Sequence, residues 1–191
     1  MGGEPSLFDS ISKDDLVMAF FPCIYFCDAS SFKFSFAEHN YRALSDEEKL
    51  KKILERSELR QRFYTLVLRL YGLALRKGFK MVLENPWSGN HYFKNNNFPK
   101  PPSIVDRDRT LRGDYFKKPT AYWFWNCEPT HGRSYQKNNN VVRIVDQPHE
   151  RGGGLCSEVR STISPDYARN FICDFIIGKE QEHSERTLFD L

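Results

Sequence analysis

Two short runs of apolar residues, Leu16–Phe21 and Met81–Leu83, stand out in the otherwise polar first half of the chain. Neither run alternates with polar residues, and continuous apolar runs of this length are typical of strands covered on both faces, as in a parallel sheet. Each run leads into a polar segment that contains proline, so each strand is expected to end there.

A long helix is predicted between these two strands. Ser45 and Glu48 form a capping box at its start, apolar residues then recur at helical spacing towards Arg76, and Gly78 is a suitable C-terminal stop. The first half of the helix is rich in Lys, Arg and Glu, which a solvated face explains. Because the order is strand, helix, strand, we predict a βαβ unit whose two strands end at the same edge of a sheet.

Two stretches show no decisive pattern. In residues 28–44, Phe32, Phe34 and Phe36 alternate with polar residues. This alternation indicates either one buried face of a short strand or clamped loop, or a mobile aromatic loop over the crevice at the sheet edge. Residues 86–112 are rich in Pro, Asn and Asp and have no periodicity, so we expect a long loop that is either functional or partly mobile.

The second half of the chain predicts short elements. Thr120–Trp125 is a clear strand candidate, and Val141–Val145 is expected to form a short strand of a hairpin, between an Asn run and a triple glycine. A final helix is predicted from Ser164, with Pro165 in its first turn. Its inner face is expected to consist of four apolar residues: Phe171, Ile172, Phe175 and Ile176.

The composition is that of a globular protein, since 40% of the 191 residues are hydrophobic and 28% are charged. No apolar run is long enough to cross a bilayer and no signal peptide opens the chain, so no membrane partner is expected. The five cysteines are odd in number and irregularly spaced, which favours reduced thiols in a cytoplasmic protein over disulfides or a metal site. A net charge of +3 favours a polyanionic partner only slightly.

Candidate chemistry lies at the predicted strand ends. Cys23 follows Pro22 after the first strand, where a thiol is either structural or, given access and a way to form its thiolate, a nucleophile. Glu84 directly follows Met-Val-Leu, and a carboxyl group in such a place is costly unless it has a partner or a task. If both strands end at one edge, the thiol and the carboxyl group face one crevice.

Several segments together resemble the DNA cytosine-5 methyltransferase family, in particular its phage-type and prophage-type members. The segments are Phe21-Pro22-Cys23, Glu84-Asn85-Pro86 and the run from Arg112 to Trp123, which reads Arg-Gly-Asp-Tyr-Phe-Lys-Lys-Pro-Thr-Ala-Tyr-Trp. A further segment, Ser157–Pro165, is similar to the arginine-containing stretch before the final helix of such proteins. The resemblance covers residues 14–178.

This resemblance implies an activity and a cofactor. Cys23 would attack carbon 6 of a flipped cytosine, and Glu84 would bind or protonate ring nitrogen 3. Carbon 5 would then take a methyl group from S-adenosyl-L-methionine, while Pro22 and Asn85 would shape the pocket. Attack on the neutral ring is poor without help at nitrogen 3, so nucleophile and acid must hold one base together.

DNA is the partner that the resemblance implies, and a basic segment offers a place for it. Arg109, Arg112, Lys117 and Lys118 lie in residues 106–118, where basic side chains outnumber acidic ones. We expect these four residues to contact DNA, within a loop-rich region that spans 86–160, although a solvated charged loop is the alternative. Lys117 and Lys118 stand where the family usually has arginine, and lysine lacks its planar fork.

One part of the family pattern is missing, because the cofactor-binding half precedes the Pro-Cys strand and only 22 residues precede Cys23 here. We therefore expect an α/β fold, a partial doubly wound, Rossmann-like methyltransferase sheet with a βαβ core and an irregular, loop- and hairpin-rich C-terminal part. Residues 1–13 would be a flexible lead-in and 179–191 a charged tail. Cofactor binding would need a complementing polypeptide or a longer parent protein. A catalytically silent DNA-binding remnant and a structural or interaction protein remain open as other functions.

Overall fold

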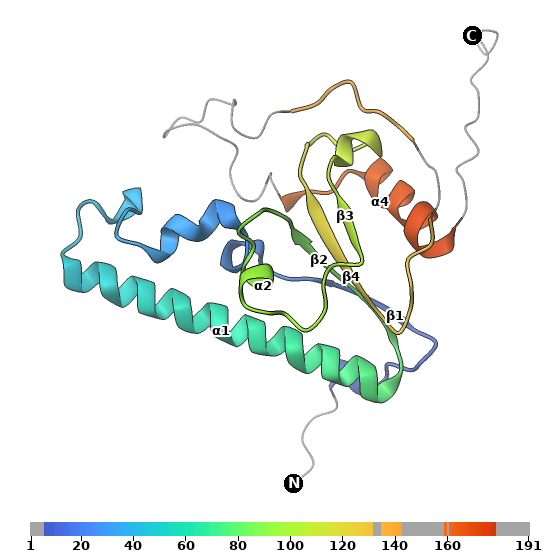
Figure 1. Ribbon diagram of the computed structural model, residues 1–191, viewed down its shortest axis with the longest axis horizontal. Helices are drawn as coiled ribbons and strands as arrows, with labels where there is room; N and C mark the ends of the chain where they lie inside the picture. Colours follow the sequence, from blue (N-terminus) through green and yellow to red (C-terminus); the bar gives the residue numbers. More distant parts are fainter. Residues whose placement is uncertain (1–5, 132–134, 143–158, 160, 179–191) are drawn as a thin grey trace. The chain divides into compact units, whose positions relative to one another are not determined.

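The computed structural model describes residues 6–131, 135–142, 159 and 161–178, and they form a mixed α/β structure around a four-stranded sheet (Figure 1). The order of the strands across the sheet is β1-β2-β4-β3. Their bounds are Leu16–Phe20 for β1, Lys80–Pro86 for β2, Ile104–Asp106 for β3 and Thr120–Trp125 for β4. The predicted α/β class is thus confirmed, and the sheet is mixed.

β1 and β2 form the parallel pair that the sequence predicts. The helix α1 (Asp46–Lys77) joins them, and the register pairs Leu16 with Lys80 and Phe20 with Glu84. β4 runs antiparallel to β2, and this pairing continues as far as Pro86 opposite Thr120. The predicted end of the second strand at Leu83 is therefore wrong, because the β4 ladder holds Glu84, Asn85 and Pro86 inside the strand.

α1 begins and ends where the sequence predicts. The Ser45 hydroxyl accepts the backbone N–H of Glu48 at 3.3 Å, and the Glu48 carboxylate accepts the N–H of Ser45 at 2.8 Å. Gly78 ends the helix with a φ of 77°, a left-handed conformation that suits glycine. The Asn126 amide then donates to the carbonyl of Ala74 at 2.7 Å, which fastens the end of β4 to the last turn of α1.

Residues 28–44 form no strand. They contain two 3₁₀ helices, η3 (Asp28–Phe34) and η4 (His39–Tyr41). Phe34 lies under the guanidinium group of Arg60, 3.8 Å from its ring centroid, while the other two alternating phenylalanines are exposed. The expected buried strand face is wrong here, because a cation–π contact with α1 holds this segment and a β ladder does not.

The long segment 86–112 contains short elements that periodicity did not predict. α2 (Tyr92–Asn95) begins at His91, whose Nδ1 accepts the N–H of Phe93 at 3.2 Å. The 3₁₀ helix η5 (Arg109–Leu111) begins at Asp108, whose carboxylate accepts the N–H of Thr110 at 3.1 Å. Side-chain caps, and not an apolar stripe, determine where these helices form.

The lead-in is attached to α1 over its described part. Residues 7–9 form the 3₁₀ helix η1 (Leu7–Asp9). The ammonium group of Lys77, in the last turn of α1, donates to the carbonyl of Phe8 at 2.5 Å and to that of Ile11 at 3.3 Å. The charged tail, 179–191, lies outside the described residues.

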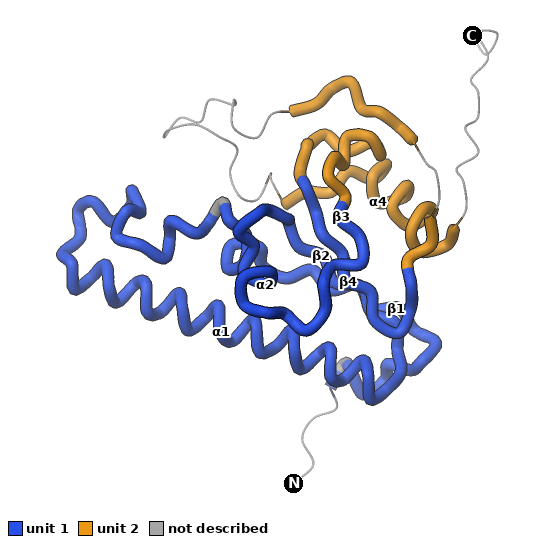
Figure 2. Tube along the Cα trace, viewed as in Figure 1, with its two compact units in different colours: residues 1–105, 119–128 blue, residues 106–118, 129–191 orange. Residues whose placement is uncertain are grey.

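The chain divides into two compact units (Figure 2). The first contains residues 1–105 and 119–128, and the second contains 106–118 and 129–191. In the second unit, α4 (Pro165–Phe171) starts as predicted, with Ser164 accepting the N–H of Tyr167 at 3.1 Å.

Beyond α4 the helix changes its pitch. Ile172–Ile177 is a π-helix, labelled η6, which ends at Gly178. Phe171 and Phe175 are buried as expected and Ile176 is partly buried, whereas Ile172 is exposed, because the buried stripe follows Tyr167, Asn170, Phe171 and Asp174 at helical spacing. Of the predicted strand 141–145, Val142 makes a single bridge with Phe116, and residues 143–145 lie outside the described residues. Within the described ranges, no helix has the length and apolarity needed to cross a bilayer.

Candidate active site

Cys23 begins a single 3₁₀ turn, η2 (Cys23–Tyr25), shortly after β1 ends. Pro22 precedes it with a φ of −57°. The Cys23 carbonyl accepts the N–H groups of Phe26 at 3.0 Å and Cys27 at 2.9 Å, so the backbone of the cysteine is fixed by its own turn. Its side chain is half-buried.

Glu84 lies in β2, between Phe20 of β1 and Tyr122 of β4 in the sheet register. Its exposed fraction is 8%. Adjacent strands lie about 4.8 Å apart and three residues span at most about 11 Å, so the Cα atom of Cys23 is within about 16 Å of that of Glu84. The topology therefore brings these two residues to the same end of the sheet.

The segments that follow β1 and β2 are in direct contact. The carbonyl of Phe26 accepts the N–H of Tyr92 at 2.9 Å. The rings of Phe26 and Phe93 lie 4.6 Å apart between centroids. The turn that carries Cys23 thus packs on α2, which follows the strand that carries Glu84.

His91 connects α2 to β2. Because its Nδ1 accepts the N–H of Phe93, the neutral ring carries its proton on Nε2, which donates to Oδ1 of Asn85 at 3.0 Å. Burial lowers the pKa of His91 to about 4, so the ring stays neutral at physiological pH. No sequence pattern singled out this histidine.

Asn85 lies on the face of the sheet opposite to Glu84. Successive side chains of a strand point to opposite faces of the sheet, so Asn85 shares a face with Met81 and Leu83 of the core, and Glu84 points to the other face. Asn85 is fully buried and holds the start of α2 through His91. This placement gives Asn85 a structural role and separates it from Glu84.

Cys27 is a second thiol of the same turn. A hydrogen bond with Cys23 is the main cause that lowers the pKa of Cys27 to about 6, and hydrogen bonds with Ser30 lower it further, while burial opposes them. The Sγ of Cys27 lies 3.3 Å from the Ser30 hydroxyl. At neutral pH the thiolate form of Cys27 is therefore favoured, and it lies within hydrogen-bond reach of the Cys23 thiol. Among the described residues, no three His, Cys, Asp or Glu side chains are grouped to hold a metal ion.

Alkylation of Cys27 by iodoacetamide is expected to follow a titration with a midpoint near pH 6. In Cys23→Ala the midpoint should rise towards the ordinary value of 9.0, because the main stabilising hydrogen bond is lost. Since folding lowers this pKa, ionisation of Cys27 should add stability as the pH rises from about 6 to about 9, and that stability should disappear as the pH falls through 6. Peptide mapping by mass spectrometry measures the rates. Equal midpoints in both proteins would show that the hydrogen bond with Cys23 does not lower the pKa of Cys27.

The basic residues of 106–118 are divided between the interior and the surface of the second unit. Arg109 is 1% exposed, forms an ion pair with Asp114, and places its guanidinium carbon 4.3 Å from the ring centroid of Tyr167. Arg109 is therefore a structural residue of the interior, and not the surface residue that a DNA contact requires.

Arg112 and Lys117 form ion pairs with aspartates. Arg112 binds Asp106 and Asp174, each at 3.1 Å, and Lys117 lies 3.4 Å from Asp108. The Lys117 side chain is nevertheless 68% exposed, whereas Arg112 and Lys118 are partly buried. Of the four predicted DNA-contacting residues, Lys117 lies most openly at the surface.

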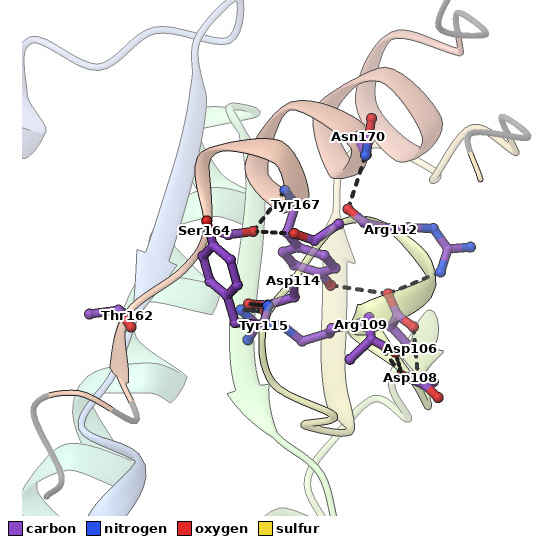
Figure 3. Close-up of polar contacts among 12 residues, drawn as sticks. Asp106, Asp108, Arg109, Arg112, Asp114, Tyr115, Thr162, Ser164, Tyr167 and Asn170 are labelled. Atoms are coloured by element: carbon purple, nitrogen blue, oxygen red, sulfur yellow. Dashed lines mark hydrogen bonds and ion pairs between the residues drawn. The ribbon is translucent and has the colours of Figure 1, made fainter. Parts of the chain in front are cut away.

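Two of the segments that resemble the methyltransferase family meet in the second unit. Gly113 has a φ of 88°, and a Cβ atom there would lie 2.8 Å from the Cβ of Asp166. The Ser164 hydroxyl donates to the carbonyl of Gly113 at 2.9 Å, and the Asn170 amide donates to that of Arg112 at 2.9 Å (Figure 3). The Arg-Gly-Asp turn therefore fits against the start of α4. Arg160, in the fourth segment, lies outside the described residues.

Comparisons with protein-family models, with curated proteins and with solved structures found no match to this chain.

Proposed function

We propose that this chain is the catalytic part of a DNA cytosine-5 methyltransferase, in which Cys23 forms a covalent bond with carbon 6 of a flipped cytosine. One observation carries the proposal: Cys23 follows β1, and Glu84 lies in the adjacent parallel strand β2, paired with the last residue of β1, so both lie at the sheet end where open α/β folds bind their ligands. The half-buried thiol and the nearly buried carboxyl group suit a pocket that closes around one base.

Each residue has a defined part in this reaction. The Cys23 proton passes to the Cys27 thiolate, and Cys23 Sγ attacks carbon 6 while Glu84 gives a proton to ring nitrogen 3. The electron pair of the 5,6 double bond then becomes available at carbon 5. S-adenosyl-L-methionine would supply the methyl group. The reaction requires reduced thiols, which agrees with the cytoplasmic location that the cysteine pattern predicts.

The free edge of β1 supports a complementing polypeptide. β1 is the end strand of the sheet, and its outer edge has no strand partner in the part of the chain that the structure describes. Phe20, near its end, is 55% exposed. A doubly wound sheet extends on both sides of its switch point, and an uncovered edge offers backbone groups for a further strand. We propose that the cofactor-binding half adds its strands here.

DNA that contains 5-azacytosine tests the nucleophile without a methyl donor, because the ring nitrogen at position 5 makes carbon 6 more electrophilic. The full chain is expected to form an adduct that survives denaturing electrophoresis. Cys23→Ala should abolish the adduct, and mass spectrometry should place the nucleotide on Cys23. Cys127→Ala, at a partly buried thiol on another segment, is the matched control and should retain it. If Cys23→Ala forms as much adduct as the wild type, the proposal is wrong.

A catalytically silent DNA-binding remnant is the second candidate, and the exposed position of Lys117 favours it. This function predicts salt-sensitive DNA binding that S-adenosyl-L-methionine does not change. Retarded but non-covalent complexes with 5-azacytosine DNA, weakened by Lys117→Glu, would favour the remnant over the enzyme.

A further inference from the structure

One side of α1 carries a row of leucines, two of which are exposed in the described chain. Of the 32 residues of α1, only Val67 and Ala74 are buried. Leu59 and Leu66 are 40% and 42% exposed, and Leu73, which is partly buried against the core, continues the row at the same spacing of seven residues. We call these three residues the leucine row. Two surface hollows of about 520 and 260 Å³ lie beside it, and Leu66 and Arg69 line both.

A row of charges runs along α1 beside the leucine row. Its members lie seven residues apart, so they share one side of the helix. They are Glu48, Glu55, Arg62, Arg69 and Arg76, and all five are exposed. The row is acidic in the first half of the helix and basic in the second. An antiparallel copy of the same helix reverses this order, so the charge row is complementary to itself.

We infer that two copies of this chain associate through α1, antiparallel and about a two-fold axis near Arg62. In this register Glu55 of one copy faces Arg69 of the other, and Glu48 faces Arg76. Leu59 of one copy then lies one residue from the position opposite Leu66 of the other, beside the hollows that Leu66 lines. Charged positions that flank an apolar seam form ion pairs of this kind between helices and determine their orientation.

The charge pattern favours a second copy over an unrelated helix. A two-fold interface uses the same surface on both partners, so it requires complementarity of that surface with itself. An acidic foreign helix would suit the arginines but would meet like charge at Glu48 and Glu55. The contact from position 48 to position 76 spans about 42 Å at 1.5 Å per residue, so the register engages almost all of α1.

Two single charge reversals test the register. Glu55→Arg and Arg69→Glu each place like charges opposite one another at both symmetric positions. Both side chains are exposed, and neither forms a hydrogen bond or ion pair within the described chain, so the fold should be unaffected. Glu48 is avoided because it closes the capping box of α1. Sedimentation equilibrium in about 50 mM salt should show a wild-type dimer and a dissociation constant at least about 10-fold higher for each variant.

Mixing the two variants restores both attractive pairs, so the mixture should form a heterodimer of near wild-type affinity. The double variant E55R/R69E should dimerise with itself for the same reason. Arg62→Gln should tighten the dimer about 2-fold, because it removes a like-charge pair at the axis. A wild-type chain that is still monomeric at about 100 µM would overturn the inference, because the dimer would then be too weak to be specific. So would a mixture of the variants that associates no better than each alone.

Discussion

Glu84→Gln is expected to slow formation of the Cys23 adduct on 5-azacytosine DNA by at least about 100-fold, because glutamine cannot give a proton to the ring. The substitution keeps the size of the side chain, which matters for a residue with an exposed fraction of 8%. Single-turnover adduct formation, followed by denaturing electrophoresis over time, measures the rate. Circular dichroism checks that the fold is kept.

Glu128→Gln is the matched control, since Glu128 is an exposed carboxyl group just beyond β4. It should form adduct at the wild-type rate. If both substitutions slow adduct formation by a similar factor, Glu84 is not the acid of the reaction. The slowing would then come from the loss of a negative charge in general. Unchanged rates with Glu84→Gln, together with an adduct that depends on Cys23, would show that the thiol reacts without a protein acid at this position.

The βαβ core was predictable because each of its signals is local. The capping box of Ser45 and Glu48, the stop at Gly78 and the unbroken apolar runs act within a few residues of their own positions. The extension of β2 to Pro86 was not predictable in this way. It depends on the pairing with β4, whose residues lie more than thirty positions further along the chain.

The site itself was predicted only in part. Cys23 follows a strand end that the sequence marks, and Glu84 lies within β2, but the lowered pKa of Cys27 depends on a hydrogen bond with Cys23 that spacing alone does not reveal. His91 lies between regular elements, where no periodicity identifies a buried side chain. Arg109 shows the opposite error, because counting basic residues cannot tell which of them pair with an aspartate in the interior.

Asp114→Ala is expected to destabilise the second unit by about 3–5 kcal/mol, because it leaves the Arg109 guanidinium buried without its counter-charge. The Asp114 carboxylate also accepts the N–H of Tyr115 at 2.7 Å, and this hydrogen bond is lost as well. Hydrogen exchange measured by mass spectrometry on peptides from 106–118 and 161–178 gives a local readout. Exchange there should rise by a factor of 100 or more, while peptides of β1 and β2 serve as the internal reference.

A surface ion pair provides the control for this effect. Lys117→Ala breaks the contact with Asp108, but the Lys117 side chain is 68% exposed, so a change of less than about 1 kcal/mol is expected. Replacing both partners, in Arg109→Leu with Asp114→Leu, should recover much of the lost stability, because no unpaired charge then remains in the interior. If Asp114→Ala lowers the stability no more than Lys117→Ala does, water must reach Arg109. Arg109 would then be a candidate for a surface contact with DNA again.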